Sequence, residues 1–310
     1  MCILMATRAH PNYDLVLVSN RDEFFARKAN IAGWRHDDYV LSPCDVALKP
    51  LSQKDFGTWI GVNKDGRIAT ILNLRLNDPT KARPAVCMRS RGKIPTTFLS
   101  ASGSSFDEWD TYEKYCEKLP SLKETGDFNF FYGGCTKGEY VVIDSLGDTF
   151  QVLRENDDEY MVVSNDKFKT GRGDGPRWQK VDLAAQTLRK LIENTSVESE
   201  ESLIQKLFEV ASLNTLQKED YEARHERAVE LAKRTIFVPP LKVSANDDLG
   251  TSVPVGTYYG TRSQTLILVS KDRSHITYVE RIIHDTDLDA QKFDSNRAKS
   301  VKRFDFDLHR

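Results

Sequence analysis

The amino-acid sequence predicts an α+β fold in which strands and helices belong to separate layers. Short apolar runs typical of strands occupy the first third of the chain and recur over residues 128–163 and 265–281. Helical periodicity is confined to a short block after Ser105 and a longer block over residues 177–235. Because strands and helices do not alternate strictly, a parallel sheet is disfavoured and an α+β layered architecture is expected.

Two hairpins are predicted in the first third of the chain. Pro11 and Asn12 supply turn chemistry between the first two apolar runs. Asp65 and Gly66 join the next two runs, and this pair accepts the positive φ that a tight hairpin needs. The four predicted strands cover residues 3–6, 15–18, 59–62 and 68–74.

Helices and strands follow in blocks after residue 100. Ser105 is suited to cap a helix that carries Phe106, Trp109, Tyr112 and Cys116 on one apolar face. Two consecutive prolines end the later helical block, because proline cannot continue a helix. The other predicted elements are strands over residues 128–132, 140–143, 150–153, 161–163, 265–270 and 276–281, and helices over residues 177–192, 203–211 and 222–235.

The length and composition indicate one folded domain. Hydrophobic residues make up 39% of the 310 residues and charged residues 29%, which is ordinary for a folded protein. No linker divides the chain into two domains. We therefore expect a single domain over residues 1–290, followed by a charged C-terminal tail over residues 291–310 that is loosely held or packed on an edge.

The charge balance excludes two classes of partner. The formal net charge of −2 provides no basic field for nucleic acid or for an anionic membrane, so no nucleic-acid partner is expected. The apolar run at the N-terminus is too short for a signal peptide or a membrane span. A cytoplasmic location without a transmembrane segment is therefore expected.

The cysteines and histidines indicate a reducing compartment and no metal site. The six histidines show no paired spacing of metal ligands, so we expect no metal and no cofactor. The five cysteines form an odd, scattered set without a Cys-x-x-Cys pair, which fits a reducing compartment. They are Cys2, Cys44, Cys87, Cys116 and Cys135.

Cys2 is the sharpest candidate for chemistry. A small residue after the initiator methionine normally permits removal of Met1, which would leave a free α-amine and a thiol on one residue. An α-amine titrates at about 7.7–8.0, so it can act as a base for the thiol without a histidine. The alternative is that Cys2 is a small apolar residue that opens a buried strand.

Four consecutive polar residues, Asn20 to Glu23, end the second predicted strand. A cation at this position would lower the pKa of a nearby thiol, and a carboxylate would hold the α-amine. The alternative is an ordinary cluster of ion pairs and caps at the end of a strand.

Several short motifs extend these features along nearly the whole chain. They are Met1-Cys2, residues 19–25, residues 57–63 with 65–67, residues 72–75, 90–92 and 163–165, and residues 261–263 with 279–281. The combination resembles the NRDE family, also called the transport and Golgi organisation 2 family. The resemblance implies a four-layer αββα sandwich of the N-terminal-nucleophile (Ntn) hydrolase type. It also implies cytoplasmic, Golgi-associated or mitochondrial proteins linked to protein secretion, lipid and acyl-coenzyme A homeostasis, and haem transport.

The order of the motifs is also similar to Ntn cysteine amidases of the choloylglycine-hydrolase type. By that similarity Cys2 matches the nucleophile, Asn73 and Asn165 match two later asparagines, and Arg262 matches a late arginine. Asn165 and the backbone near Asn73 would then polarise an acyl oxygen.

The adjacent pair Arg21 and Asp22 departs from the amidase pattern, in which two residues separate the arginine from the aspartate. Neighbours on a strand point to opposite faces. Both side chains therefore reach Cys2 only if the chain has already left strand geometry there. This departure favours a binding role over catalysis.

Two functions are expected from these residues. In the first, the protein is a hydrolase that acts on an acyl-bearing small molecule, an amide or an acyl-coenzyme A thioester. In the second, the same pocket belongs to a non-catalytic carrier of haem, acyl-coenzyme A or lipid, linked to Golgi organisation and protein secretion. The expected catalytic residues are Cys2, Arg21, Asp22, Asn73 and Asn165, and the expected ligand-binding residues are Asn20, Glu23, Arg75 and Arg262.

Overall fold

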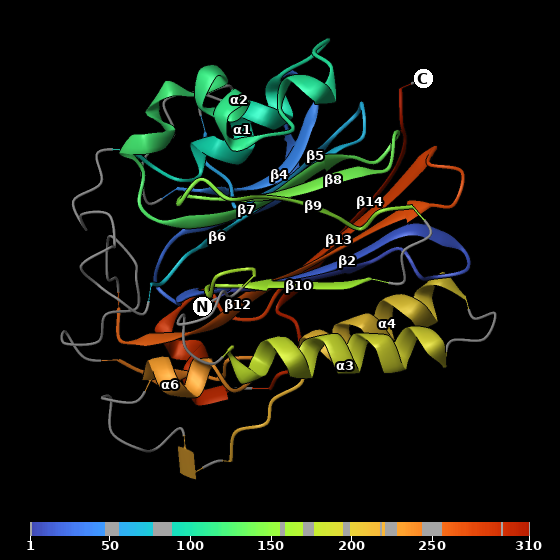
Figure 1. Ribbon diagram of the computed structural model, residues 1–310. Coiled ribbons are helices and arrows are strands. Elements are labelled where there is room, and N and C mark those ends of the chain that lie inside the picture. The colour runs from blue at the N-terminus through green and yellow to red at the C-terminus, as the bar shows by residue number, and fades with distance from the viewer. Residues whose placement is uncertain are drawn as a thin grey trace.

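The structure is a stack of four layers, two sheets covered on both outer faces by helices (Figure 1). The computed structural model describes residues 2–46, 56–76, 89–155, 159–169, 177–194, 199–217, 219–220, 228–243, 256–292 and 294–309. In this part of the chain each sheet has seven strands, and the named strands pair antiparallel throughout. The layer order confirms the predicted αββα sandwich.

Sheet A holds the N-terminal strand between two partners. In spatial order its strands are β10 (Tyr160–Ser164), β1 (Ile3–Thr7), β2 (Tyr13–Phe24), β12 (Tyr258–Ser270), β13 (His275–Ile282) and β14 (Ser300–Asp307), with β11 (Leu241–Lys242) paired to β12. Ile3 lies opposite Asn20 of β2 and opposite Ser164 of β10. The residue before Ile3 therefore lies beside the ends of both neighbouring strands.

Sheet B runs in chain order. Its strands are β3 (Ala29–Arg35), β4 (Val40–Asp45), β5 (Ile60–Asn63), β6 (Arg67–Asn73), β7 (Phe128–Gly134), β8 (Glu139–Asp144) and β9 (Thr149–Val152). The turn between β5 and β6 contains Gly66 at a φ of 83°, so the predicted hairpin is confirmed. A Cβ at Gly66 would lie 2.8 Å from Cys135 Sγ, so a larger residue would displace its neighbours.

Two sets of helices cover the outer faces of the sheets (Figure 1). α3 (Gln179–Glu193), α4 (Glu200–Ala211) and α6 (Ala228–Ala232) cover sheet A, whereas α1 (Lys93–Ser100), α2 (Tyr112–Lys118) and the 3-10 turns η2 (Phe106–Glu108) and η3 (Pro120–Glu124) cover sheet B. α3 and α4 confirm two predicted helices. Within the third, α6 is helical and residues 221–227 lie outside the described residues. None of the described helices combines the length and apolar composition that a membrane crossing requires.

The continuous helix predicted after Ser105 is wrong, because two separate caps divide it. Ser105 caps only the 3-10 turn η2, through a capping box with Glu108. Thr111 Oγ1 then accepts a hydrogen bond from Lys114 N and begins α2. The elements α1, β3 and β4 were not predicted from the sequence. Most residues of β3 are half-buried, and its sequence lacks the alternation of apolar and polar residues that marks a strand.

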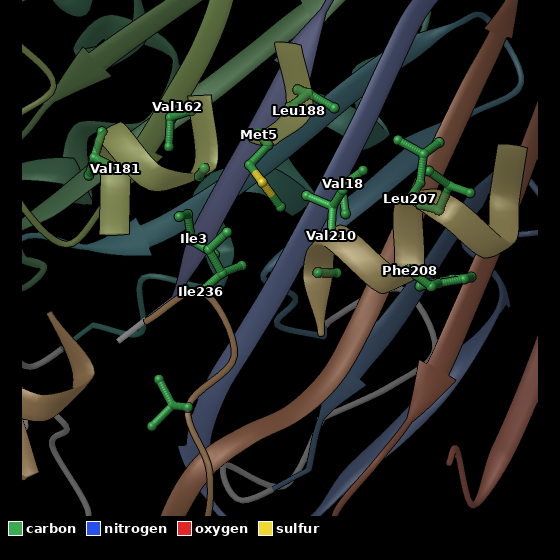
Figure 2. Packing of buried hydrophobic residues seen from close by; sticks show 14 of the residues in the cluster. Ile3, Met5, Val18, Val162, Val181, Leu188, Leu207, Phe208, Val210 and Ile236 are labelled. Atoms are coloured by element: carbon green, nitrogen blue, oxygen red, sulfur yellow. The ribbon is translucent and has the colours of Figure 1, made fainter. Parts of the chain in front are cut away.

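Apolar cores fill the three spaces between the four layers. On β1, Ile3 and Met5 face α3 and α4, while Leu4 and Ala6 face sheet B. Figure 2 shows Ile3, Met5 and Val18 on the helix side of sheet A, beside residues of α3 and α4. Each fully buried side chain of this size contributes roughly 1.5–3 kcal/mol. The strands that carry the N-terminal site are therefore anchored on both faces.

The last described strand, β14, comes from the segment that the sequence indicates as a charged tail. It pairs along the whole of β13, from His275 opposite Asp307 to Ile282 opposite Ser300. Phe306 packs against the core between the sheets, and its ring centroid lies 4.9 Å from that of Trp34. β14 thereby forms one edge of sheet A.

Candidate functional site

Cys2 lies at the end of β1, between β10 and β2. Its carbonyl oxygen accepts a hydrogen bond of 2.8 Å from Ser164 Oγ on β10. Its Sγ lies 3.7 Å from the carbonyl oxygen of Asp22 on β2. The side chain is half-buried and packs against the core between the sheets. The thiol is thus positioned by strands on both sides.

Burial is the main influence on the Cys2 thiol, and it raises the pKa of that group above its ordinary value. The charge of Asp22 also raises this pKa, whereas the charge of Arg21 lowers it. The resting thiol is therefore protonated near neutral pH. A nucleophilic role for Cys2 needs a base beside it.

Arg21 and Asp22 point to opposite faces of β2, as strand geometry requires. Arg21 faces sheet B, where its guanidinium carbon lies 4.0 Å from the ring centroid of Trp59. Asp22 faces the helices, and its Oδ1 accepts a hydrogen bond of 2.7 Å from Thr261 Oγ1. The chain is still a strand here, so the two charges approach the end of β1 from different sides.

Lys180 is a residue of this region that the sequence analysis missed. It is fully buried on α3, and its Nζ lies 3.6 Å from Asp22 Oδ2. Burial lowers the pKa of Lys180, and the charge of Asp22 acts against that change. Lys180 lies on the same helical stripe as the buried residues Ala184, Leu188 and Ile192. A charged residue on an apolar stripe is the sequence signal that would have revealed it.

Asn165 and Asn73 come together across the two sheets. Asn165 follows β10, and its Nδ2 donates a hydrogen bond of 2.6 Å to the carbonyl oxygen of Asn73 at the end of β6. The backbone N–H of Arg75 donates in return to the carbonyl oxygen of Asn165 at 2.8 Å. Because Ser164 bonds the backbone of Cys2, these residues share one end of the sandwich with the thiol.

Asn20 and Glu23 lie on different faces of β2. Asn20 faces the helices, where its Nδ2 donates a hydrogen bond of 2.8 Å to the carbonyl oxygen of Ala211 at the end of α4. Glu23 faces sheet B with Arg21, and its Oε2 lies 3.8 Å from Arg21 and 3.7 Å from Arg27. Glu23 is therefore close to Arg21, whereas Asn20 connects sheet A to α4.

A cavity of about 220 Å³ lies beside Arg21. Its lining includes Arg21, Asn30, Trp59, Arg262, Ser263 and His284. Cys2 is not among the lining residues, whereas Arg21 lines the cavity and its charge lowers the pKa of the Cys2 thiol. Within the described residues, no group of three or more His, Cys, Asp or Glu side chains is arranged to hold a metal ion.

A bulge in β12 brings Arg262 to this cavity. Thr261 lies opposite Asp22 and Ser263 lies opposite Arg21, so Arg262 is an extra residue without a partner in the ladder between β12 and β2. Such a bulge redirects a side chain at the edge of a site. The sequence contains no signal for it, because a bulge depends on the register between two distant strands.

Arg262 is held in place by backbone oxygens. Its Nε donates a hydrogen bond of 3.1 Å to the carbonyl oxygen of His284, and another of its nitrogens donates to the carbonyl oxygen of Arg27. Burial lowers the pKa of Arg262 to about 10, and the like charge of Arg21 contributes. Burial also lowers the pKa of His284 to about 4, so its imidazole is neutral at physiological pH.

Glu280 is a second buried ionisable residue that the sequence analysis did not assign. It lies on the face of β13 that Ile276 and Tyr278 share, between the sheets. Its Oε2 accepts a hydrogen bond of 2.5 Å from Ala32 N, whereas its buried Oε1 has no hydrogen-bond partner among the described residues. Burial raises the pKa of Glu280 to about 7. A carboxyl at an apolar position of a strand is the pattern that points to it.

Two solved structures align with this chain over most of its length. A variant of conjugated bile acid hydrolase from Clostridium perfringens aligns at a TM-score of 0.43 and 11% identity, over 98% of this chain and 97% of that one. The Caenorhabditis elegans ortholog of N-acylethanolamine-hydrolyzing acid amidase aligns at a TM-score of 0.39 and 11% identity, over 86% and 92% of the two chains.

The chain also has relatives of similar length. An uncharacterized protein of Saccharomyces cerevisiae is 45% identical over 99% of this chain and 100% of its own length. The human Transport and Golgi organization protein 2 homolog is 26% identical over 89% of each chain. The family profile described as Transport and Golgi organisation 2 matches residues 1–285. Because that match spans nearly all of the 310 residues, the chain belongs to the Transport and Golgi organisation 2 family.

Proposed function

We propose that this protein acts on the acyl group of a small molecule through Cys2, as an N-terminal cysteine hydrolase of an amide or an acyl-coenzyme A thioester. The observation that carries the proposal is the meeting of Cys2, Asn165 and Asn73 at one end of the two sheets. The resemblance of the motif order to Ntn cysteine amidases supplies the type of reaction.

In the proposed reaction, removal of Met1 frees the α-amine of Cys2, and this amine accepts the thiol proton. Sγ forms a bond to the acyl carbon, and the carbonyl π electrons move to the oxygen. The tetrahedral intermediate then expels the amine or the coenzyme A thiol, which takes the proton from the α-ammonium group. Water hydrolyses the resulting thioester on Cys2 and releases the acid. A nearby base suits a thiol whose pKa is raised by burial.

Asn165 is the proposed donor to the developing oxyanion. A side-chain amide has two N–H groups, and Asn165 uses one of them on the carbonyl oxygen of Asn73. The second N–H of Asn165 is the proposed donor to an acyl oxygen, a role whose loss costs about 10²–10³ in rate. The backbone N–H groups of Leu74 and Arg75, beside Asn73, already donate to the carbonyl oxygens of Asp127 and Asn165. Arg21 would position the substrate and Asp22 would orient the α-amine.

A non-catalytic carrier is the second candidate, because Asp22 faces the helices and is engaged by Thr261 and Lys180. In this role the same pocket would bind acyl-coenzyme A, lipid or haem in connection with Golgi organisation and protein secretion. For both candidates we infer a single domain over residues 1–290 and a cytoplasmic location, with the Golgi surface or the mitochondrion as alternatives.

Mass spectrometry tests the hydrolase directly. The native protein is incubated with a long-chain acyl-coenzyme A or an N-acyl amide, quenched in acid, and compared with Cys2→Ala and with Cys116→Ala, which removes a half-buried thiol on the far side of sheet B. We expect an N-terminus that begins at Cys2, an acyl adduct on Cys2, and turnover that Cys2→Ala abolishes and Cys116→Ala retains. A retained Met1, or full turnover by Cys2→Ala, rules the mechanism out. Tight binding without turnover identifies the carrier instead.

A further inference from the structure

Arg21 is a buried guanidinium whose hydrogen-bonding capacity is unused. Its side chain is 7% exposed, yet it donates no hydrogen bond within the described part of the chain. The nearest carboxylate oxygens, on Glu23 and Asp45, lie 3.8 Å away, beyond hydrogen-bonding distance. The ring of Trp59 covers one face of the guanidinium, at 4.0 Å. A buried arginine normally satisfies several donors, so this one can still bind an acceptor from outside the described residues.

Ser263 presents a second unused polar group to the same cavity. It is 3% exposed, and its Oγ has no hydrogen-bond partner among the described residues. Ser263 lies directly opposite Arg21 in the ladder between β12 and β2. Opposed residues of an antiparallel pair project to the same face, with Cβ atoms about 4.5–5.5 Å apart. The hydroxyl and the guanidinium therefore converge on one point of the cavity wall, which both residues line.

Among the described residues, the charges around the cavity leave one positive charge in excess. Three guanidinium groups, those of Arg21, Arg27 and Arg262, meet two carboxylates, Glu23 and Asp45. Arg27 takes the stronger contacts, because its Nε and Nη2 lie 3.0 and 2.8 Å from Asp45 Oδ2.

Two further carboxyl groups lie near the cavity, and neither cancels the excess near neutral pH. Asp285 lines the cavity and is paired with Lys299. Burial raises the pKa of Glu280 to about 7, so this group is only partly ionised there. An anion in the cavity would therefore meet a net positive charge.

We propose that this cavity is an oxyanion site that binds the carboxylate or phosphate group of the small molecule whose acyl carbon lies at Cys2. The planar fork of Arg21 suits two oxygens of one such group, Ser263 Oγ donates to an oxygen, and Arg262 supplies the second positive charge. A volume of about 220 Å³ accepts the anionic group and a few further atoms but not a long acyl chain. The link to Cys2 rests on the proposed function, whereas the anion site does not.

Direct titration of the Cys2→Ala protein tests the site without any reaction at the thiol. The probes are n-propyl phosphate, butyrate and, as a neutral control, 1-butanol, each followed by calorimetry or by chemical shifts of the arginine side chains. We expect saturable binding of one or both anions and none of the alcohol. The anion with the higher affinity shows whether the site prefers a phosphate or a carboxylate. Equal binding of 1-butanol, or no binding of either anion, overturns the proposal.

Substitutions in the lining then locate the binding. We expect Arg21→Gln to weaken anion binding at least tenfold and Ser263→Ala, which removes only the hydroxyl oxygen, to weaken it about three- to tenfold. Arg89→Gln removes an exposed guanidinium outside the cavity and serves as the matched control. If Arg21→Gln does not fold, Arg21→Lys replaces it, because lysine keeps the charge but loses the planar guanidinium. Ser263→Ala still tests whether the anion binds at this cavity. Unchanged binding in Ser263→Ala and in the Arg21 variants places the anion elsewhere and refutes the site.

Discussion

Asn165 Nδ2 donates a hydrogen bond of 2.6 Å to the carbonyl oxygen of Asn73, and this bond ties the end of β10 in sheet A to the end of β6 in sheet B. The two residues are separated by more than ninety positions in the chain. The main chain strengthens the link, because Arg75 N donates to the carbonyl oxygen of Asn165. The link closes the sandwich beside Cys2.

We predict that Asn165→Ala lowers the free energy of unfolding by about 1–3 kcal/mol, because it leaves the carbonyl oxygen of Asn73 without this donor. Urea denaturation followed by circular dichroism measures the change. Asn194→Ala is the control, since Asn194 makes the same kind of bond, to Lys190, at an exposed position. Its cost should stay within about 0.5 kcal/mol. Equal losses in the two variants would contradict a special role for the link between the sheets.

The buried pair of Lys180 and Asp22 should respond strongly to removal of one partner. Lys180→Met leaves the carboxylate of Asp22 buried beside an apolar side chain, and we expect a loss of about 3–5 kcal/mol in the free energy of unfolding. The double variant Asp22→Asn with Lys180→Met should lose less than the sum of the two single variants, because no charge is then stranded.

An exposed ion pair provides the comparison for Lys180. Lys114 Nζ lies 2.7 Å from Asp110 Oδ1, and the two side chains are 45% and 31% exposed. Lys114→Met should cost less than about 1 kcal/mol. Strict additivity of the Asp22 and Lys180 substitutions in chemical denaturation would show that the two groups do not interact.

Glu280 should make the protein less stable as the pH rises. Burial raises the pKa of Glu280 from 4.5 to about 7. Below pH 4.5 the carboxyl is protonated in both states, whereas between pH 4.5 and 7 the unfolded chain loses a proton that the folded protein retains. Stability therefore falls across this window and levels off above it, by a total on the order of 3 kcal/mol.

The substitution Glu280→Gln removes this contribution and keeps an oxygen for Ala32 N. As the pH rises from 5 to 8, we expect the unfolding free energy of Glu280→Gln to increase relative to that of the wild type. The exposed Glu139→Gln should show no such trend. Parallel pH profiles for the wild type and Glu280→Gln would refute the assignment.

The rate at which the Cys2 thiol is alkylated should depend on the charges of Arg21 and Asp22, which lie on opposite faces of β2. Burial raises the pKa of its thiol, so alkylation by iodoacetamide should be slow at neutral pH and accelerate at alkaline pH. Because Arg21 lowers this pKa and Asp22 raises it, Arg21→Gln should move the midpoint of alkylation upward and Asp22→Asn should move it downward. Peptide mapping of the alkylated protein measures both. Shifts of the same sign would contradict the arrangement.

The sequence alone predicted those helices and strands whose pattern lies within one short segment of the chain. The Asp65 and Gly66 turn specified the hairpin of β5 and β6, because a positive φ at the glycine selects a tight connection. The apolar stripes of α3 and α4 were long enough to be read as helices. The motif combination indicated the four-layer fold, and the order of the layers confirms it (Figure 1). The helix predicted after Ser105 failed because Thr111 supplies a second cap that competes with continuous periodicity.

Only the tertiary structure decided which polar groups meet. Periodicity states which face of a strand or helix a residue occupies, but not what lies opposite. The contacts of Lys180 with Asp22, and of Asn165 with Asn73, depend on how α3 and the two sheets stack. Likewise, the bulge at Arg262 sets Ser263 opposite Arg21 and thereby builds the cavity wall. Register and layer packing arise from contacts between residues far apart in the chain, and no local pattern contains them.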